Sequence, residues 1–586
     1  MAAWGEGPSR LERLMRAGSG ARRDVALDLL MLVLLAVLLF AAGFGLRDPW
    51  PADEPRFALV ARDMLRSGDW LFPRVGGDLY ADKPPLYFWL MAASMALTGS
   101  MWLGFLLPSL LAGLGTSLLV YDLLRRARGR EVALAGAFML LITFQFAWQA
   151  RQAQIDATLC FLTTLSLYGL LRHVLLGPAR RWYLVGWAAA GLGVITKGVG
   201  FLPLLALLPH ALLARRGWPA AAPRSGALLA GGIGAMLVAI GTWFVPMIVA
   251  SSASGELLAY RNEILFRQTV TRYAEAWHHH APVWYYFVEV VPFLWLPLVA
   301  LLPWLWPRWR EALRARDTLV AVLLAWVLIV LLFFTASSGK RGVYVLPAVP
   351  ALAMAAAPWL PGLLRAPGTR RLAFLLAGGL VAFAAGSALY FAFDAAAAGK
   401  IVAAYGMQPA LPLALVAGGG AAVLLWLRAR DGWLAYAAVL AVVMLTVGFV
   451  VSPRIDAVRS AREFMRTVER ASSGIVELGL VGPKEQYLLQ LRRPSINFGH
   501  ARWREREAEA ADAAAWLAQQ PGRGLLLDAR ALEACFQEAD AREIARANRQ
   551  SWFLVTGTPD AGCVARGDAS RARFYRPPDA AINTDS

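Results

Sequence analysis

The chain contains very few lysines. Only five of its 58 basic residues are lysine, and three of these lie in the short motifs KPPL, TKG and SSGKR, as Lys83, Lys197 and Lys340. Arginine supplies positive charge elsewhere, so these motifs use a compact ammonium where the chain otherwise uses a planar guanidinium. The placement indicates a functional requirement at the three lysines, with chance as the alternative explanation.

Cysteine and recognisable soluble-enzyme motifs are also scarce. Of the three cysteines, Cys160 lies in an apolar run, and Cys535 and Cys563 lie in the polar C-terminal part. An oxidising compartment would let the last two pair, and the sequence leaves this open. The polar part shows no glycine fingerprint or catalytic motif, so it does not disclose a chemistry of its own.

Apolar runs, in contrast, are long and frequent. Apolar residues make up 58% of the chain, and its mean hydropathy is +0.50. Runs of about 18 or more such residues predict an integral membrane protein. The first run, 28–46, is too long for a signal-peptide core and lacks a convincing cleavage site, so we expect a retained span. The net charge of +18 therefore indicates membrane topology rather than a nucleic-acid partner.

Arginine-rich loops predict how the spans are oriented. Loops that should be cytoplasmic lie at 10–23, 125–131, 172–181, 215–224, 307–317, 365–371 and 428–431. All of these loops fall on the cytoplasmic side if the spans lie near 27–46, 103–124, 132–150, 157–174, 182–196, 199–214, 226–250, 284–305, 318–336, 343–362, 372–392, 410–427 and 433–451. We therefore predict an α-helical polytopic membrane protein with about 13 transmembrane helices, a cytoplasmic segment 1–26 and a membrane domain 27–452.

The first outer loop, 47–102, is expected to have a structure of its own. Within it, 54–66 has the pattern of an amphipathic helix. The apolar stretch 84–98 would reverse every later span if it crossed the membrane, so we interpret it as an interfacial or re-entrant helix.

The composition after residue 452 is that of a soluble domain. Helical patterns at 456–470, 504–519 and 531–547 alternate with short apolar runs at 475–482, 524–528 and 552–556. This alternation predicts a small α/β domain over 453–586, on the outer side of the membrane.

Motifs in the first outer loop resemble those of a known family. They are Asp53-Glu54, Arg56-Phe57-Ala58, Arg62-Asp63-Met64-Leu65, Ser67-Gly68-Asp69-Trp70 and Lys83-Pro84-Pro85. Together they resemble the first periplasmic loop of the bacterial protein-mannosyltransferase-like family, which includes the aminoarabinose transferases that modify lipid A. Further matches follow in the family's order: Asp156, Thr196-Lys197-Gly198, HHHAPVWYY at 278–286, and Lys340-Arg341 with Tyr344 and Pro347.

The resemblance implies a C-type glycosyltransferase membrane fold and an inverting sugar transfer from a polyprenyl (undecaprenyl) monophosphate. The reaction would take place at the periplasmic face of the bacterial inner membrane. The acceptor could be lipid A, another envelope glycan, or a protein Ser/Thr hydroxyl as in O-mannosyltransferases. A lipid-linked sugar transporter or flippase is the alternative from another class. Transporters tend to show internal repeats and charges at mid-membrane, and neither pattern is visible here.

The expected chemistry assigns roles to the two acidic motif residues. Displacing the phosphate develops positive charge on the sugar and negative charge on the leaving group. Asp53 is the expected general base for an acceptor hydroxyl, or it orients a phosphate acceptor that needs no base. Its structural alternative is a helix N-cap. Asp156 is a second catalytic candidate, although it could simply favour the dipole of the helix that it begins or pair with Arg151.

The cationic motif residues are expected to bind the substrates. Lys83, Lys340 and Arg341 are candidates for the donor phosphate, with ordinary snorkelling at the membrane surface as the alternative. Lys197 is a weaker candidate of the same kind. The resemblance adds the remaining substrate-binding candidates, namely Glu54, Arg56 and Tyr344.

A divalent metal ion is a further expectation. Its candidate ligands are Asp82 and His279, since carboxylate and imidazole are common metal ligands. Relatives that modify lipid A typically carry Glu before Lys-Pro, where this chain has Asp82. This chain therefore differs from the aminoarabinose branch at Asp82, which is one of the two expected metal ligands.

The topology can be tested directly. A reporter fused after Arg128 should report a cytoplasmic location, because the cluster at 125–131 lies in a predicted inner loop. A periplasmic signal from this fusion would mean that 84–98 crosses the membrane and that Asp156 lies on the wrong side.

Overall fold

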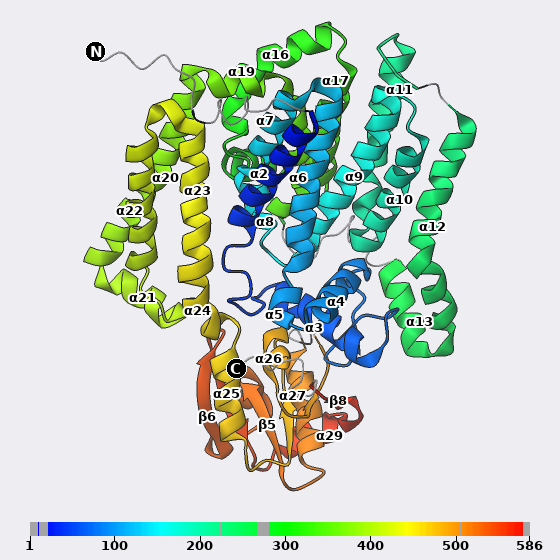
Figure 1. The fold of residues 1–586 in the computed structure, drawn as a ribbon. Helices are drawn as coiled ribbons and strands as arrows, with labels where there is room; N and C mark the ends of the chain where they lie inside the picture. The colour runs from blue at the N-terminus through cyan, green and yellow to red at the C-terminus, as the bar shows by residue number, and fades with distance from the viewer. Residues whose placement is uncertain are drawn as a thin grey trace.

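The structure combines a helical bundle with a sheet-containing C-terminal domain. It is a computed structural model that describes residues 10, 21–222, 225–265, 280–500, 502 and 505–577. Figure 1 shows the bundle at one end, the sheet domain at the other, and the short helices α3, α4 and α5 between them.

The bundle contains both long and broken helices. Its longer helices are α2 (Ala21–Phe40), α6 (Leu107–Arg128), α7 (Arg130–Leu141), α9 (Ile155–Leu176), α10 (Arg180–Lys197), α12 (Gly226–Ala250), α16 (Leu302–Arg314), α17 (Thr318–Ala336), α20 (Pro367–Phe393), α21 (Ala395–Tyr405), α22 (Ala410–Leu427) and α23 (Gly432–Thr446). Its shorter segments are α8 (Phe144–Gln149), η1 (Val199–Ala206), α11 (Leu207–Arg215), η2 (Ser251–Ala253), α13 (Gly255–Asn262), η4 (Tyr286–Val290), α15 (Val291–Leu294), η5 (Val299–Leu301), η6 (Gly342–Val345), α18 (Ala348–Ala356), η7 (Ala357–Trp359), α19 (Leu360–Arg365), η8 (Ala429–Asp431), η9 (Val447–Val451) and α24 (Ser452–Arg459).

Seven helical stretches among the described residues are long and apolar enough to cross a membrane. The number is eight if the bent pair Tyr286–Leu294 and Val299–Arg314, with 99° between its parts, forms one span. This makes the chain a multi-span membrane protein, while the count of thirteen stays a prediction.

Several of the predicted spans are broken in the structure, among them 199–214 and 284–305, and two further examples show how. The run 132–150 forms α7 and α8, separated by Thr143 in an extended conformation. The run 343–362 forms η6, α18, η7 and α19. In the second case Pro358 and Pro361 interrupt the pattern, since proline lacks the N–H that an uninterrupted helix needs.

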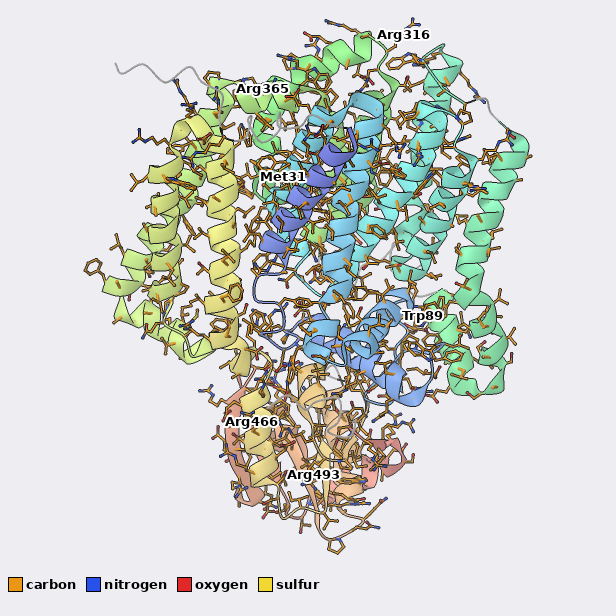
Figure 2. All side chains as sticks on the ribbon, viewed as in Figure 1. Met31, Trp89, Arg316, Arg365, Arg466 and Arg493 are labelled. Carbon is orange, nitrogen blue, oxygen red and sulfur yellow. A yellow bond between two sulfur atoms is a disulfide. The ribbon has the colours of Figure 1, made fainter. Side chains whose placement is uncertain are left out.

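Arginines gather at the end of the bundle opposite the sheet domain. Arg316 and Arg365 lie there, whereas Trp89 lies in the intervening layer and Arg466 lies in the sheet domain (Figure 2). Arg365 also pairs with Glu131, which joins two of the loops predicted to share one side.

The first outer loop folds into a layer of short elements. These are α3 (Glu54–Ser67), β1 (Arg74–Val75), β2 (Asp78–Leu79), α4 (Leu86–Thr98) and α5 (Met101–Gly104). Phe57 of α3 packs against Tyr87 and Phe88 of α4, with ring centres 5.7 and 5.6 Å apart. With 13 residues, α4 is about 20 Å long, shorter than a hydrocarbon core. It therefore matches the interpretation of 84–98 as a helix that does not span.

The C-terminal domain is built around one mixed sheet. Its elements are α25 (Arg462–Ala471), β3 (Glu477–Leu480), α26 (Glu485–Gln490), β4 (Ser495–Asn497), α27 (Arg506–Leu517), β5 (Arg523–Asp528), α28 (Ala529–Cys535), η11 (Glu538–Asp540), β6 (Ala541–Ala547), β7 (Gln550–Val555), α29 (Ala561–Arg566), η12 (Ala569–Arg571) and β8 (Arg573–Tyr575). The strand order is β6-β7-β5-β3-β4-β8. Strand β3 is parallel to β4 and β5, and the other pairs are antiparallel.

The helix expected at 531–547 is wrong in its second half. Helix α28 ends at Cys535, and Ala541–Ala547 forms the edge strand β6, paired with β7. Asn548 and Arg549 between the two strands have φ of 51° and 64°, the conformation that a tight hairpin turn requires. Pairing across this turn outweighs the helical propensity of the segment.

The sheet domain docks on α3 through buried contacts. Arg62 of α3, 1% exposed, donates to the carbonyl of Leu489 at 2.9 Å and to the hydroxyl of Tyr575 at 2.7 Å. Before α3, Asp48 accepts from Arg462 of α25 at 2.6 Å. Apolar residues of α3, α4, α25 and α26 belong to one continuous core. The domain and the first outer loop therefore form one packed unit.

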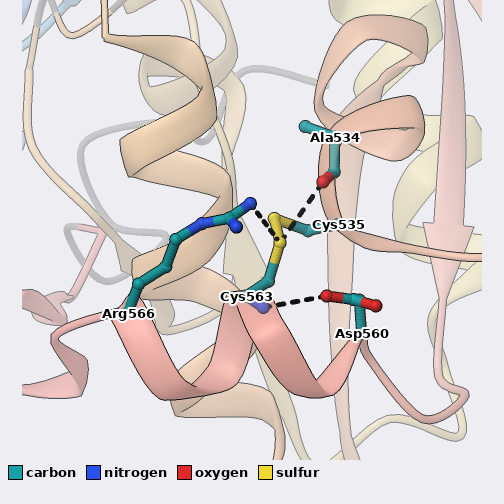
Figure 3. The surroundings of a disulfide bond; sticks show 5 residues. All are labelled: Ala534, Cys535, Asp560, Cys563 and Arg566. Atoms are coloured by element: carbon teal, nitrogen blue, oxygen red, sulfur yellow. Dashed lines mark hydrogen bonds between the residues drawn. A yellow bond between two sulfur atoms is a disulfide. The ribbon is translucent and has the colours of Figure 1, made fainter.

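A disulfide joins Cys535 and Cys563, whose Cα atoms lie 5.6 Å apart (Figure 3). The carboxylate of Asp560 caps α29 by accepting from the backbone N–H of Cys563 at 2.9 Å. Arg566 lies on the other side of the bond, with Nη2 3.0 Å from the sulfur of Cys563. The sequence had left this pairing open.

The disulfide should contribute measurably to stability. Replacing both Cys535 and Cys563 by Ser removes a link across 28 residues, which should lower the free energy of unfolding of the C-terminal domain by roughly 3 kcal/mol. Thermal unfolding of the purified protein measures this, and alkylation with a maleimide before and after reduction establishes the bond. Equal melting curves for the two proteins would contradict the prediction.

Candidate active site

Asp53 lies immediately before α3, where a helix cap was the alternative to a functional role. Its side chain makes no capping hydrogen bond. The carboxylate instead accepts from Arg341 at 3.0 Å and from Gln154 at 3.4 Å. It therefore faces neighbours from two other parts of the chain.

Glu54 has a different environment from its neighbour. It is 3% exposed and forms two hydrogen bonds with the guanidinium of Arg47. It also accepts from the backbone N–H groups of Trp50 and Ala153, each at 2.9 Å. The expectation that Glu54 binds substrate is not supported by these contacts, because protein groups occupy both of its oxygens.

Asp156 and Lys197 form a second part of the site. Asp156 lies in the first turn of α9, and the ammonium of Lys197, at the end of α10, donates to its carboxylate. The same ammonium lies 4.3 Å from the ring centre of Tyr344, a favourable cation–π arrangement. Arg151, the partner considered for Asp156, instead donates to the carbonyls of Met444 and Ala42.

Arg341 connects the two parts. Its carbonyl accepts from the backbone N–H of Tyr344 at 3.0 Å, so both residues belong to one turn. Burial favours a lower pKa for Arg341, but the charge and hydrogen bond of Asp53, together with the charge of Asp156, raise the pKa overall. The structure thus brings Asp53, Asp156, Lys197, Arg341 and Tyr344 together.

Lys340 is placed differently from Arg341. It is 5% exposed and donates to the carbonyls of Ala281 and Ser337 at 3.0 and 2.6 Å. These bonds fasten 337–340 to the segment at 280–281, which also contains a backbone bridge from His280 to Gly339. A direct contact between Lys340 and a donor phosphate is not supported by this geometry, whereas a role in holding Arg341 in place is.

Lys83 lies in the loop before α4 and is half-buried. Its ammonium donates to the carbonyl of Asp82 at 3.1 Å. The expected contact of Lys83 with a phosphate stays a prediction.

Arg56 points from α3 toward the sheet domain. Its Nε donates to the carboxylate of Glu485 at 2.7 Å, and His500 approaches the same oxygen at 3.0 Å. The guanidinium carbon lies 5.9 Å from the ring centre of Tyr80. Sequence reasoning missed Glu485 and His500, because no local pattern relates them to a residue more than 400 positions earlier.

The expected metal site is only partly covered by the structure. Asp82 is exposed, and His279 lies outside the described residues. Within the described part of the chain, no three His, Cys, Asp or Glu side chains form a ligand set for a metal ion. Metal binding by Asp82 and His279 stays a prediction, and the chemistry proposed for this chain includes no step at a metal.

Comparisons with known proteins identify the family. Residues 82–243 match the model of the dolichyl-phosphate-mannose-protein mannosyltransferases. Over 422 residues the chain is 30% identical to the undecaprenyl phosphate-alpha-4-amino-4-deoxy-L-arabinose arabinosyl transferase of Pectobacterium carotovorum, covering 70% of each protein. The chain belongs to the aminoarabinose transferase-like glycosyltransferases of the protein-mannosyltransferase family. The corresponding Pseudomonas aeruginosa enzyme is 31% identical over 57% of this chain, and the match spans 59% of that enzyme's length.

The fold of this chain is also found in a solved structure. ArnT from Cupriavidus metallidurans, crystallised with undecaprenyl phosphate, superimposes with a TM-score of 0.70 at 22% identity. The alignment covers 91% of this chain and 98% of ArnT. The chain therefore has the membrane fold of C-type glycosyltransferases.

The contact between Arg56 and Glu485 should depend on pH. Burial alone would raise the pKa of Glu485, but His500 and Arg56 outweigh it and lower the pKa from 4.5 to about 2. Its contribution to stability is therefore complete above pH 4.5 and is lost as the pH falls toward 2. The melting temperatures of the wild type and of Glu485→Gln should differ less at pH 3 than at pH 7. An equal difference at both pH values would contradict this assignment.

Proposed function

We propose that this chain is an inverting glycosyltransferase that transfers a sugar from undecaprenyl monophosphate to lipid A or another envelope acceptor. The observation that carries the proposal is the carboxylate of Asp53, which does not cap its helix and lies 3.0 Å from Arg341. A second carboxylate and a second cation, Asp156 and Lys197, pair with each other, and the charge of Asp156 acts on Arg341. The names of the relatives support a pentose, 4-amino-4-deoxy-L-arabinose, as the sugar.

The site supplies charge where the reaction develops it. The bond between the sugar carbon and the phosphate oxygen breaks, and an acceptor oxygen bonds to that carbon from the opposite face, which inverts it. Arg341 has five N–H donors and uses one for Asp53, so others can contact the leaving phosphate. Lys197 and Lys83 supply further positive charge. Carboxylates near the sugar stabilise its developing positive charge.

The role of Asp53 depends on the acceptor. An acceptor hydroxyl must lose a proton, and Asp53 would take it as general base. A phosphate oxygen of lipid A is already anionic near neutral pH, so Asp53 would then orient the acceptor. A protein O-mannosyltransferase acting on Ser/Thr is the second candidate, supported by the family model that matches residues 82–243.

A lipid-linked sugar transporter or flippase is less well supported. Asp53, Lys83 and Arg341 lie in loops near one end of the bundle rather than within its long spans. Transporters typically place their charges at mid-membrane, in broken helices. The family membership of the chain favours transfer chemistry as well.

The proposed location is the bacterial inner membrane, with the N-terminus in the cytoplasm and both the site and the 453–586 domain in the periplasm. The clustered arginines at the opposite end of the bundle support this orientation (Figure 2). The disulfide in the C-terminal domain also supports it, because such bonds persist in oxidising compartments. The proposed topology has thirteen transmembrane spans.

Asp53→Asn should abolish transfer while leaving the protein inserted. The substitution keeps the size of the side chain but removes the charge. If the acceptor is a hydroxyl, loss of the general base typically costs about 100- to 10,000-fold in rate; if it is a phosphate, the carboxylate that orients it is lost. Mass spectrometry of extracted lipid A and of membrane glycoproteins would detect the sugar, and comparison with a deletion strain would identify the acceptor.

Glu463→Gln provides a matched control. Glu463 is a surface carboxylate of α25, with 63% of its side chain exposed, and its replacement should leave the modification intact. Unchanged modification in the Asp53 variant would remove Asp53 from the mechanism.

A further inference from the structure

The contact between Arg56 and the C-terminal domain is separate from the contacts that dock the domain. Docking depends on the shared core and on Arg62, which is 1% exposed and bonded to the carbonyl of Leu489. The side chains of Arg56 and Glu485 are more open, with 26% and 14% exposed. A partly exposed ion pair contributes only about 0–1 kcal/mol to stability. Docking of the C-terminal domain therefore does not depend on the pair of Arg56 and Glu485.

The surroundings of Arg56 connect it to the candidate active site. Arg56 lies one helical turn after Asp53 on α3. Tyr80, against which its guanidinium lies, is within electrostatic range of both Asp53 and Asp82. Arg56 therefore lies in the first turn of α3, close to Asp53 along the chain, and contacts the sheet domain through Glu485.

Glu485 restricts the orientation of this guanidinium. It binds Nε of Arg56 at 2.7 Å, and His500 Nε2 lies 3.0 Å from the same oxygen. The backbone N–H of His500 in turn donates to Asp78 of the first outer loop at 2.6 Å. A guanidinium has five N–H donors, so the bond at Nε to Glu485 and the contact with the Tyr80 hydroxyl set its plane, and the remaining N–H groups can bind an anionic ligand.

We propose that Glu485, supported by His500, is a positioning residue that orients Arg56 toward a phosphate of the acceptor lipid. The C-terminal domain then completes the acceptor side of the site, while Arg341 and Lys197 serve the donor side. This inference rests on the proposed function, because it takes lipid A as the acceptor.

Steady-state kinetics of the full-length enzyme test the proposal. Glu485→Gln should raise KM for lipid A by about tenfold, which corresponds to about 1.4 kcal/mol. The value of kcat and the KM for the donor should stay within about twofold of the wild type. Unchanged kinetic constants would overturn the proposal.

A double-mutant cycle separates positioning from a general structural effect. If Glu485 acts through Arg56, Glu485→Gln should add nothing in an Arg56→Ala background. Full additivity of the two effects would overturn the proposal. Glu477→Gln is the matched control, because Glu477 pairs with Arg523 at 2.7 Å within the same domain and away from α3. If Glu485→Gln does not fold, Glu485→Asp keeps the charge and should show a smaller rise in KM.

Binding of purified lipid A without donor distinguishes the two proposals. The wild type and the control Glu477→Gln should bind lipid A with similar affinity, whereas Glu485→Gln should bind about tenfold more weakly. Equal affinity for Glu485→Gln would overturn the positioning role and leave the proposed function standing. A wild type that binds no lipid A would overturn the positioning role and exclude lipid A as the acceptor, and the proposed function would then require another envelope acceptor.

Discussion

The buried ion pair between Arg47 and Glu54 sets the geometry on which the site depends. It joins the chain before α3 to the first residue of that helix, and Ala153 binds the same glutamate from the loop before α9. Removing one partner of a buried pair typically costs about 3–5 kcal/mol, because the other charge stays buried. Since Asp53 directly precedes Glu54, the pair also fixes where the carboxylate of Asp53 meets Arg341.

The sequence alone predicted the membrane class, the family and most members of the site. Local patterns carried this information: apolar runs indicated spans, and motifs within short segments marked Asp53, Asp156, Lys197, Arg341 and Tyr344. These five residues do come together in the structure. Their mutual distances were not predictable, because they depend on how α9, α10 and η6 pack.

What sequence reasoning missed lies in contacts between distant segments. Glu485 belongs to a part of the chain without any recognised motif, and its importance appears only when α26 is placed against α3. Lys340 and Glu54 both belong to the family motifs. In the structure, however, both are buried and form hydrogen bonds with other groups of the protein. The strand β6 was mistaken for a helix because the pairing partner that stabilises it, β7, is not part of its own sequence pattern.

The order in which the chain is made has a consequence for the cell. Contacts to Asp53, Arg56 and Asp48 come from residues 288, 429 and 414 positions later. While the ribosome is still synthesising those segments, the first outer loop lacks the groups that orient it. Under the proposed function, a half-made chain therefore has no assembled site for a lipid-linked donor, and activity would begin only with the nearly finished chain.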